Sequence, residues 1–229
     1  MKQALTILVS VLCGLAQAAT VTGKIAFKGV APKSQVIRMN ADPVCAKETA
    51  GKKILRQDVV VNANATLANV FVYVKEGIDK ASIPSNVGEP AVIDQKGCMY
   101  TPRVVGVRVG QKLRISNSDS TMHNVHSLSK ANPSFNSAMP TKGQVIEKEF
   151  KKTEFPPIKM KCDVHGWMLG YIAVMEHPFF SVSDETGSFS VANLPPGSYT
   201  LEAWHETLGT KTASVTVTAA GASPVEFVF

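Results

Sequence analysis

A short stretch late in the chain brings together three side chains that bind soft transition metals. Cys162, His165 and Met168 follow one another at intervals of three residues, and an earlier stretch contributes His123 and His126. A thiolate, two imidazoles and a thioether form the ligand set of a mononuclear blue-copper site. Soft sulfur suits Cu(I), while imidazole and thiolate also hold Cu(II), so the same ligands serve both oxidation states. This ligand set predicts copper-based single-electron chemistry.

The strand expected before the metal-binding stretch has a period of two. Ile158, Met160 and Cys162 alternate with Lys159 and Lys161. Because successive side chains of a strand point to opposite faces, this pattern aims Cys162 into the interior and the lysines outward. An inward thiolate at the end of a strand is where a buried copper would need it.

The first 19 residues have the pattern of a secretory signal peptide. Lys2 supplies the positive charge, residues 5–15 the apolar run, and the small residues at 16–19 the cleavage site. The run is too short to cross a bilayer, and no later stretch is long and apolar enough either. Cys13 is not preceded by the small residues of a lipoprotein signal, so a lipid anchor is not expected. We therefore expect an exported protein without a membrane span, located in a bacterial periplasm.

The charge and composition of the chain narrow the class of partner. The formal net charge of +6 becomes +5 once Lys2 is removed. This excess of positive charge suits docking to an acidic partner, or it simply belongs to a solvated surface. Aromatic residues make up 7% of the chain, and neither a basic helix nor a nucleic-acid motif is present. A nucleic-acid-binding role is therefore not expected.

Alternating apolar residues and turn-forming residues dominate the chain, which predicts an all-β fold. The strand pattern occurs at residues 21–27, 68–74, 103–109, 113–117, 145–150, 158–162 and 171–175, and four more strands are expected between 183 and 229. Gly110-Gln111 predicts a hairpin turn, and the composition of residues 75–90 predicts a connector. The chain exceeds the usual size of one domain, so we expect two β-rich domains.

Residues 88–177 resemble the plastocyanin/amicyanin group of small blue copper proteins, the cupredoxins. Tyr100 to Asn117 resembles their opening strand pair, and Met122-His-Asn-Val-His126 resembles their first-ligand segment. Cys162-Asp-Val-His-Gly-Trp-Met168, running into a strand up to Val174, resembles their ligand loop and final strand. The two-residue spacing between histidine and methionine in this loop is that of amicyanin.

The resemblance implies a Greek-key β-sandwich that binds one type-1 copper and carries electrons without being an enzyme. It implies that His123, Cys162 and His165 are the strong equatorial ligands, with Met168 as the weak axial ligand. Asn124 matches the position whose side chain ties the two ligand loops together beside the thiolate, a contact that orients ligands. The resemblance also suggests a redox partner such as an amine dehydrogenase or a c-type cytochrome.

Alternatives remain for the first ligand and for the metal. His126 could replace His123; otherwise it is a surface histidine or a neighbour of the ligands. Zinc could replace copper, but its structural sites take four nitrogen or sulfur ligands and methionine is a poor one. Trp167 is expected to cover the metal loop, and His165 with Gly166 and Trp167 is expected to form the exit route for electrons.

The cysteine count adds one structural expectation. Removing the signal peptide leaves three cysteines, an odd number for an oxidising compartment. With Cys162 on copper, Cys45 and Cys98 are free to form a disulfide. This bridge would clamp the start of the copper domain to the domain that precedes it in the chain. The alternative pairs Cys162 with one of the other two.

The C-terminal segment resembles a second β-sandwich, the carboxypeptidase-regulatory-like or transthyretin-like domain. The likeness rests on turn and strand signals after Asp184 and Leu194, and residues 21–27 and 68–74 look like the first strands of the same sandwich. We expect a signal peptide at 1–19, an N-terminal part of the flanking sandwich at 20–85, the cupredoxin domain at 86–178, and the C-terminal part of the flanking sandwich at 179–229. Our hypothesis is that the copper domain is inserted into its host.

The predicted function is that of a periplasmic one-electron carrier, with two alternatives. Copper binding for storage, delivery or sensing is one, although such proteins use exposed Met- and His-rich clusters that this chain lacks. An extracytoplasmic binding module without a redox role is the other, and it leaves the four ligands unexplained. His177 and His205 lie outside the motif and are expected to be ordinary hydrogen-bonded histidines at the domain junction rather than a second metal site.

Overall fold

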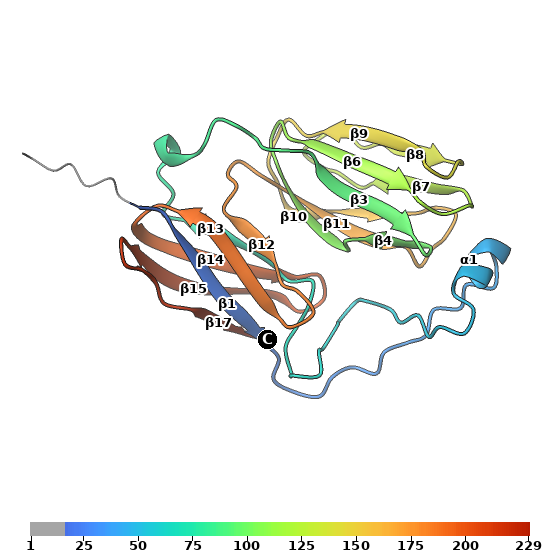
Figure 1. Cartoon of the computed structure of the whole chain (residues 1–229), viewed down its shortest axis with the longest axis horizontal. Coiled ribbons are helices and arrows are strands. Elements are labelled where there is room, and N and C mark those ends of the chain that lie inside the picture. The colour runs from blue at the N-terminus through green and yellow to red at the C-terminus, as the bar shows by residue number, and fades with distance from the viewer. Residues whose placement is uncertain (1–16) are drawn as a thin grey trace, which may run out of the picture.

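The computed structural model describes residues 17–229, so most of the predicted signal peptide, with Cys13, lies outside the described residues. The fold is all-β, as predicted, and consists of two β-sandwiches that lie side by side (Figure 1). Within residues 17–229, no helix has both the length and the apolar character that crossing a bilayer requires.

The first sandwich, which we call the flanking sandwich, packs a three-stranded sheet against a five-stranded one. The strand orders are β13-β1-β17 and β12-β2-β14-β15-β16, and β1 and β17 run parallel. The strands are β1 (Ala19–Ala26), β2 (Phe71–Glu76), β12 (Phe180–Val182), β13 (Ser188–Leu194), β14 (Gly197–His205), β15 (Gly209–Thr218), β16 (Gly221–Ala222) and β17 (Val225–Val228). One apolar core, with Ile25, Val72 and Leu201 fully buried, fills the space between the sheets.

The second sandwich, which we call the metal sandwich, has sheets of five and four strands. Their orders are β5-β11-β10-β7-β8 and β4-β3-β6-β9, with the pairs β5–β11 and β3–β6 parallel. The strands are β3 (Ala91–Lys96), β4 (Met99–Thr101), β5 (Val104–Arg108), β6 (Lys112–Asn117), β7 (His123–Ser127), β8 (Asn136–Met139), β9 (Val145–Glu149), β10 (Glu154–Lys161) and β11 (Leu169–Met175). Its core includes Leu113, Ile158, Met160 and Cys162, so the predicted alternation before the thiol is confirmed.

The order of strands along the chain separates the flanking sandwich into two parts. Strands β1 and β2 come before the metal sandwich, and β12 to β17 come after it. A connector that includes the short 3₁₀ helix η1 (Lys80–Ser82) leads from β2 to β3. The metal sandwich thus lies in sequence between two segments that share sheets with each other.

The predicted hairpin at Gly110-Gln111 is wrong. A turn does form there, with the Gln111 amide donating to the Arg108 carbonyl at 3.0 Å. However, β5 pairs with β11 while β6 pairs with β3 and β9, so the two strands belong to different sheets. Val107 and Leu113 flank the turn and are both fully buried in the one core. The turn therefore carries the chain from one layer to the other, because both apolar faces must reach the same interior.

An apolar interface, which also contains the ion pair between Arg103 and Glu206, joins the two sandwiches. Phe71 of β2 and Trp204 of β14 pack against Val104 and other residues of β5 and β11. Gly106 on β5 permits this approach, since a Cβ there would lie 2.4 Å from the ring of Phe180. An interface with a buried aromatic core holds domains in a fixed relation better than a polar one does.

Between β1 and β2 the chain leaves the flanking sandwich and reaches the far end of the metal sandwich (Figure 1). We call residues 27–66 the N-terminal arm. The arm contains the helix α1 (Pro43–Glu48), which begins with Asp42 as N-cap and Pro43 in its first turn. Both residue types favour helix starts. The predicted disulfide between Cys45 and Cys98 anticipated one contact between this part of the chain and the metal sandwich, but the other contacts of the arm were not predicted.

Candidate metal centre

Two loops at one end of the metal sandwich carry the predicted ligands. His123 is the first residue of β7, while Cys162, His165 and Met168 lie in the loop between β10 and β11. Strands β7 and β10 are paired, with Lys161 opposite His126, and this pairing places the two loops side by side.

Three donor atoms converge at this end of the sandwich. The Nδ1 atoms of His123 and His165 are 2.9 Å apart, and the Sγ of Cys162 lies 3.9 Å from the Nδ1 of His165. Each of these three residues offers one ligand atom within 4.8 Å of the others. The exposed fractions of His123, Cys162 and His165 are 0%, 2% and 2%, so the donors face one another away from solvent.

Met168 is fully buried in the same apolar cluster as Cys162. The amide of Met168 donates to the His165 carbonyl at 2.9 Å, and the Met168 carbonyl accepts from the Cys162 amide at 3.2 Å. These two bonds fold the ligand loop into a tight turn, so the thioether is carried on the same turn as the thiol and the imidazole.

Asn124 connects the start of β7 with the loop between β10 and β11. Its Oδ1 accepts from the Asp163 amide at 2.6 Å and lies 3.3 Å from the Sγ of Cys162. Its Nδ2 donates to the side chains of Asn136 and Asp163. The amide of His165 also points at the Cys162 sulfur, at 3.3 Å. The sulfur thus sits in a ring of polar contacts that fixes its position.

The remaining histidines lie outside the cluster of donors. His126 is partly exposed, and its Nδ1 lies 2.9 Å from Asp163 Oδ2. His177 and His205 are buried, and each Nδ1 accepts backbone N–H bonds, from Phe179 and from the loop after β14 respectively. The geometry therefore groups His123, not His126, with the thiol.

Two carboxylates contact His123 and His165 on the ring edges that face away from the thiol. The Nε2 of His123 lies 2.9 Å from Asp119 Oδ2, and the Nε2 of His165 lies 3.1 Å from Asp42 Oδ2. An ionised carboxylate only accepts hydrogen bonds, so each Nε2 must carry the hydrogen. In a neutral ring the lone pair then lies on Nδ1, the atom that faces the thiol. Metal-binding histidines are commonly oriented in this way by carboxylates.

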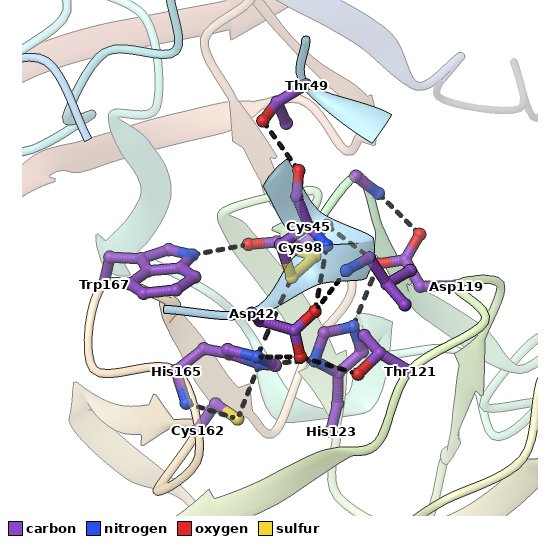
Figure 2. The surroundings of a disulfide bond; sticks show 12 residues. Asp42, Cys45, Thr49, Cys98, Asp119, Thr121, His123, Cys162, His165 and Trp167 are labelled. Atoms are coloured by element: carbon purple, nitrogen blue, oxygen red, sulfur yellow. Dashed lines mark hydrogen bonds and ion pairs between the residues drawn. A yellow bond between two sulfur atoms is a disulfide. The ribbon is translucent and has the colours of Figure 1, made fainter. Parts of the chain in front are cut away.

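A disulfide joins the two residues whose backbone amides donate hydrogen bonds to these carboxylates. It joins Cys45 in α1 to Cys98 at the tip of the β3–β4 hairpin, as predicted (Figure 2). The Asp42 carboxylate accepts from the Cys45 amide at 3.0 Å, and Asp119 accepts from the Cys98 amide at 2.8 Å. Gly97 and Cys98 both have positive φ, a conformation typical of tight hairpin turns and natural for glycine. Cys162 is the free cysteine of the described chain.

The ionisable groups of the site shift one another's pKa values. Burial raises the pKa of Asp42, but bonds from Cys45, Thr121 and His165 lower it to about 2. Burial lowers the pKa of His123, yet Asp119 and the thiol raise it to about 9.

The thiol and His165 shift in the same direction for different reasons. Burial raises the pKa of Cys162, but the hydrogen bond with His123 and nearby backbone bonds lower it overall. Burial and the charge of His123 lower the pKa of His165. Both shifts favour the deprotonated forms that bind metals, whereas the raised pKa of His123 means that a metal must displace a proton from that ring.

The N-terminal arm covers the edge of His165 that was expected to be the exit route for electrons. Asp42 contacts its Nε2, and Cys45 Sγ lies 3.7 Å from the same atom. On the other side, the ring of Trp167 is 5.0 Å from the His165 ring, and its Nε1 donates to the Cys98 carbonyl at 3.0 Å. The arm therefore lies between this edge of His165 and solvent.

Sequence reasoning missed both carboxylates. Asp42 precedes Pro43, a helix-start signal that would have placed it at an N-cap. The expected disulfide would then have brought this N-cap close to Cys98. Asp119 lies four residues before His123, but nothing in the spacing distinguishes it from an ordinary loop aspartate.

Comparison with known proteins finds similarity for separate parts of the chain. A family model described as polysaccharide lyase family 4, domain II, matches residues 177–224. Among curated proteins, none matches the chain.

Several solved structures resemble part of the chain. A copper-containing nitrite reductase from Thermus scotoductus SA-01 is 22% identical, with a TM-score of 0.35, and the match covers 43% of this chain and 27% of that one. A purple cupredoxin from Nitrosopumilus maritimus is 25% identical, with a TM-score of 0.32, covering 37% and 98%. An amicyanin variant in its Cu(I) form is 19% identical, with a TM-score of 0.34, covering 46% and 98%. At TM-scores this low, none of these likenesses supports a function for the chain.

Proposed function

We propose that the protein is a periplasmic type-1 copper protein that carries single electrons between redox partners. The observation that best supports this is the convergence of His123 Nδ1, His165 Nδ1 and Cys162 Sγ within 4.8 Å. Carboxylates contact the Nε2 atoms of both rings, so a neutral form of either ring directs its Nδ1 lone pair inward. Copper held by these residues would supply reversible one-electron chemistry between Cu(I) and Cu(II).

The buried thioether of Met168, the fourth proposed ligand, favours copper over zinc. Met168 lies on the same turn as Cys162 and His165 and is fully buried. A thioether is a poor ligand for zinc, whereas a thiolate, two imidazoles and a weak methionine suit a blue-copper site. With four protein ligands, no position stays open for a substrate, which favours an electron carrier over an enzyme.

The burial of the donors favours electron transfer over copper delivery. A protein that hands copper to another must let a ligand of the acceptor reach the metal, and that requires an exposed donor. The exposed fractions of His123, Cys162 and His165 are at most 2%. An electron can cross such a closed cage, whereas a metal ion cannot leave it without opening the arm or the loop.

We propose a partner with an acidic surface, such as a dehydrogenase or a c-type cytochrome. Without Lys2 the formal charge is +5, one less than the +6 of the whole chain. Lys47, Lys52 and Lys53 are exposed in and just after α1, the part of the arm that covers His165. Complementary charge steers such encounters and raises their rate.

We also propose that residues 20–85 and 179–229 form one discontinuous folding unit with residues 86–178 inserted into it. The pairing of β1 with β13 and of β2 with β14 supports this, because each pair joins the two segments. Limited proteolysis tests the proposal. The two segments should stay associated after cleavage, whereas release of 179–229 as a folded fragment would contradict it.

The proposed function predicts one reversible redox centre per chain. The copper-loaded protein, reduced and then titrated with a chemical oxidant, should take up and release one electron per molecule without loss of copper. Cys162→Ser is the control, because it removes the thiolate while keeping a side chain of similar size. A wild-type protein that releases copper on reduction would instead support the delivery function.

A further inference from the structure

The N-terminal arm supplies a side chain to the candidate metal centre. Asp42 belongs to the arm, which precedes the metal sandwich in the chain, and yet its Oδ2 lies 3.1 Å from His165 Nε2. The same oxygen accepts from Thr121 Oγ1 at 2.8 Å. The other oxygen caps α1 by accepting from the amides of Val44 and Cys45, at 2.8 and 3.0 Å. The carboxylate is therefore fixed by four donors.

The arm is attached firmly enough at this place to orient a ligand. The disulfide between Cys45 and Cys98 ties α1 to the β3–β4 hairpin. Met39 of the arm is buried with these cysteines, and Trp167 of the ligand loop packs against the same small cluster. In Figure 2, Asp42 lies between the disulfide and the rings of His165 and His123.

We propose that Asp42 is a positioning residue of the metal centre, which fixes His165 as the Nε2–H tautomer and places a negative charge at its outer edge. This inference rests on the proposed function. Because the carboxylate can only accept, the lone pair of His165 is directed at Cys162 and His123. A negative charge behind a ligand also stabilises the higher charge of Cu(II) relative to Cu(I), which lowers the reduction potential.

The variant Asp42→Asn isolates this role from the helix cap. Asparagine caps helices as well as aspartate does, so α1 and the disulfide should stay intact. The matched control is Asp79→Asn, since Asp79 caps η1 in the same way and is absent from the contacts of the metal centre. A second variant, Asp42→Ser, keeps a capping oxygen but is too short to reach His165.

The first readout uses copper-free protein labelled with ¹⁵N. Long-range ¹H–¹⁵N NMR spectra identify which ring nitrogen of His165 carries the hydrogen. The wild type and Asp79→Asn should show the Nε2–H tautomer, and Asp42→Ser should show a mixture. A wild type with the hydrogen on Nδ1 would overturn the proposal even if the variants did not fold.

The second readout is the reduction potential of the copper-loaded protein. Loss of an outer partner of a ligand weakens metal binding about 10-fold or more. If Cu(II) is weakened about tenfold more than Cu(I), the potential of Asp42→Asn rises by about 59 mV. A potential within 10 mV of the Asp79→Asn control, roughly a sixth of that shift, would refute the role of Asp42. If the protein binds no type-1 copper, the proposed function fails, but the NMR test still decides the role of Asp42.

Discussion

Removing the disulfide between Cys45 and Cys98 is expected to lower the free energy of unfolding by about 4 kcal/mol. The two cysteines are 53 residues apart in the chain. In the chain-entropy model, a cross-link that closes a loop of this length stabilises the fold by about 4 kcal/mol at 25 °C. For a protein of this size, that loss corresponds to a fall in melting temperature of roughly 8–16 °C.

The assay is guanidinium unfolding of the copper-free protein, followed by tryptophan fluorescence. Trp167 reports on the disulfide, because its indole bonds to the Cys98 carbonyl, and Trp204 reports on the interface between the sandwiches. The double variant Cys45→Ala/Cys98→Ala is compared with Cys162→Ala, which removes a buried sulfur without breaking a bridge. A double variant that loses less than about 1 kcal/mol relative to this control would show that the bridge does not restrain the arm as described.

Three further perturbations test other parts of the structure. His123→Ala should abolish the blue absorption of the copper-loaded protein, whereas His126→Ala should leave it nearly unchanged; the opposite result would exchange their roles. Arg103→Met should lower stability by about 3–5 kcal/mol in urea unfolding, because it leaves the buried carboxylate of Glu206 without its partner at 2.5 Å. Adding Glu206→Gln should restore part of that loss, and equal stability of both variants would argue against the pair. Burial lowers the pKa of His177 from 6.5 to about 4, so the unfolded chain binds the proton first as pH falls. Stability should therefore drop by up to about 3 kcal/mol between pH 6.5 and 4. His177→Asn should flatten that slope relative to wild type, and an unchanged slope would contradict it.

The ligand loop could be predicted because its information is local. Cys162, His165 and Met168 lie within seven residues and follow a strand of period two, so the sequence alone places them on one loop, where the Cys162 Sγ and His165 Nδ1 lie 3.9 Å apart. The pairing of Cys45 with Cys98 followed from counting cysteines once Cys162 had another role. These features depend on short distances along the chain or on elimination, not on the details of packing.

The parts that could not be predicted depend on long-range topology. Asp42 reaches His165 across 123 residues, and although the predicted disulfide ties the arm to Cys98, nothing in the sequence indicates which side chain of the arm meets the histidine. The turn at Gly110-Gln111 shows the same limit. Two adjacent strands with a turn signal predict a hairpin, but whether they pair with each other or with β11 and β3 is decided by the whole sandwich.

We propose that His123, Cys162 and His165 hold one copper in a thiolate-bound site. The most direct test loads residues 20–229 with Cu(II) and records visible absorption and electron paramagnetic resonance spectra of the same sample. The sample should show an intense blue charge-transfer band and a narrow copper hyperfine splitting, and both should be lost in Cys162→Ser. A colourless protein, or one with the wide splitting of ordinary tetragonal copper, would contradict the proposal.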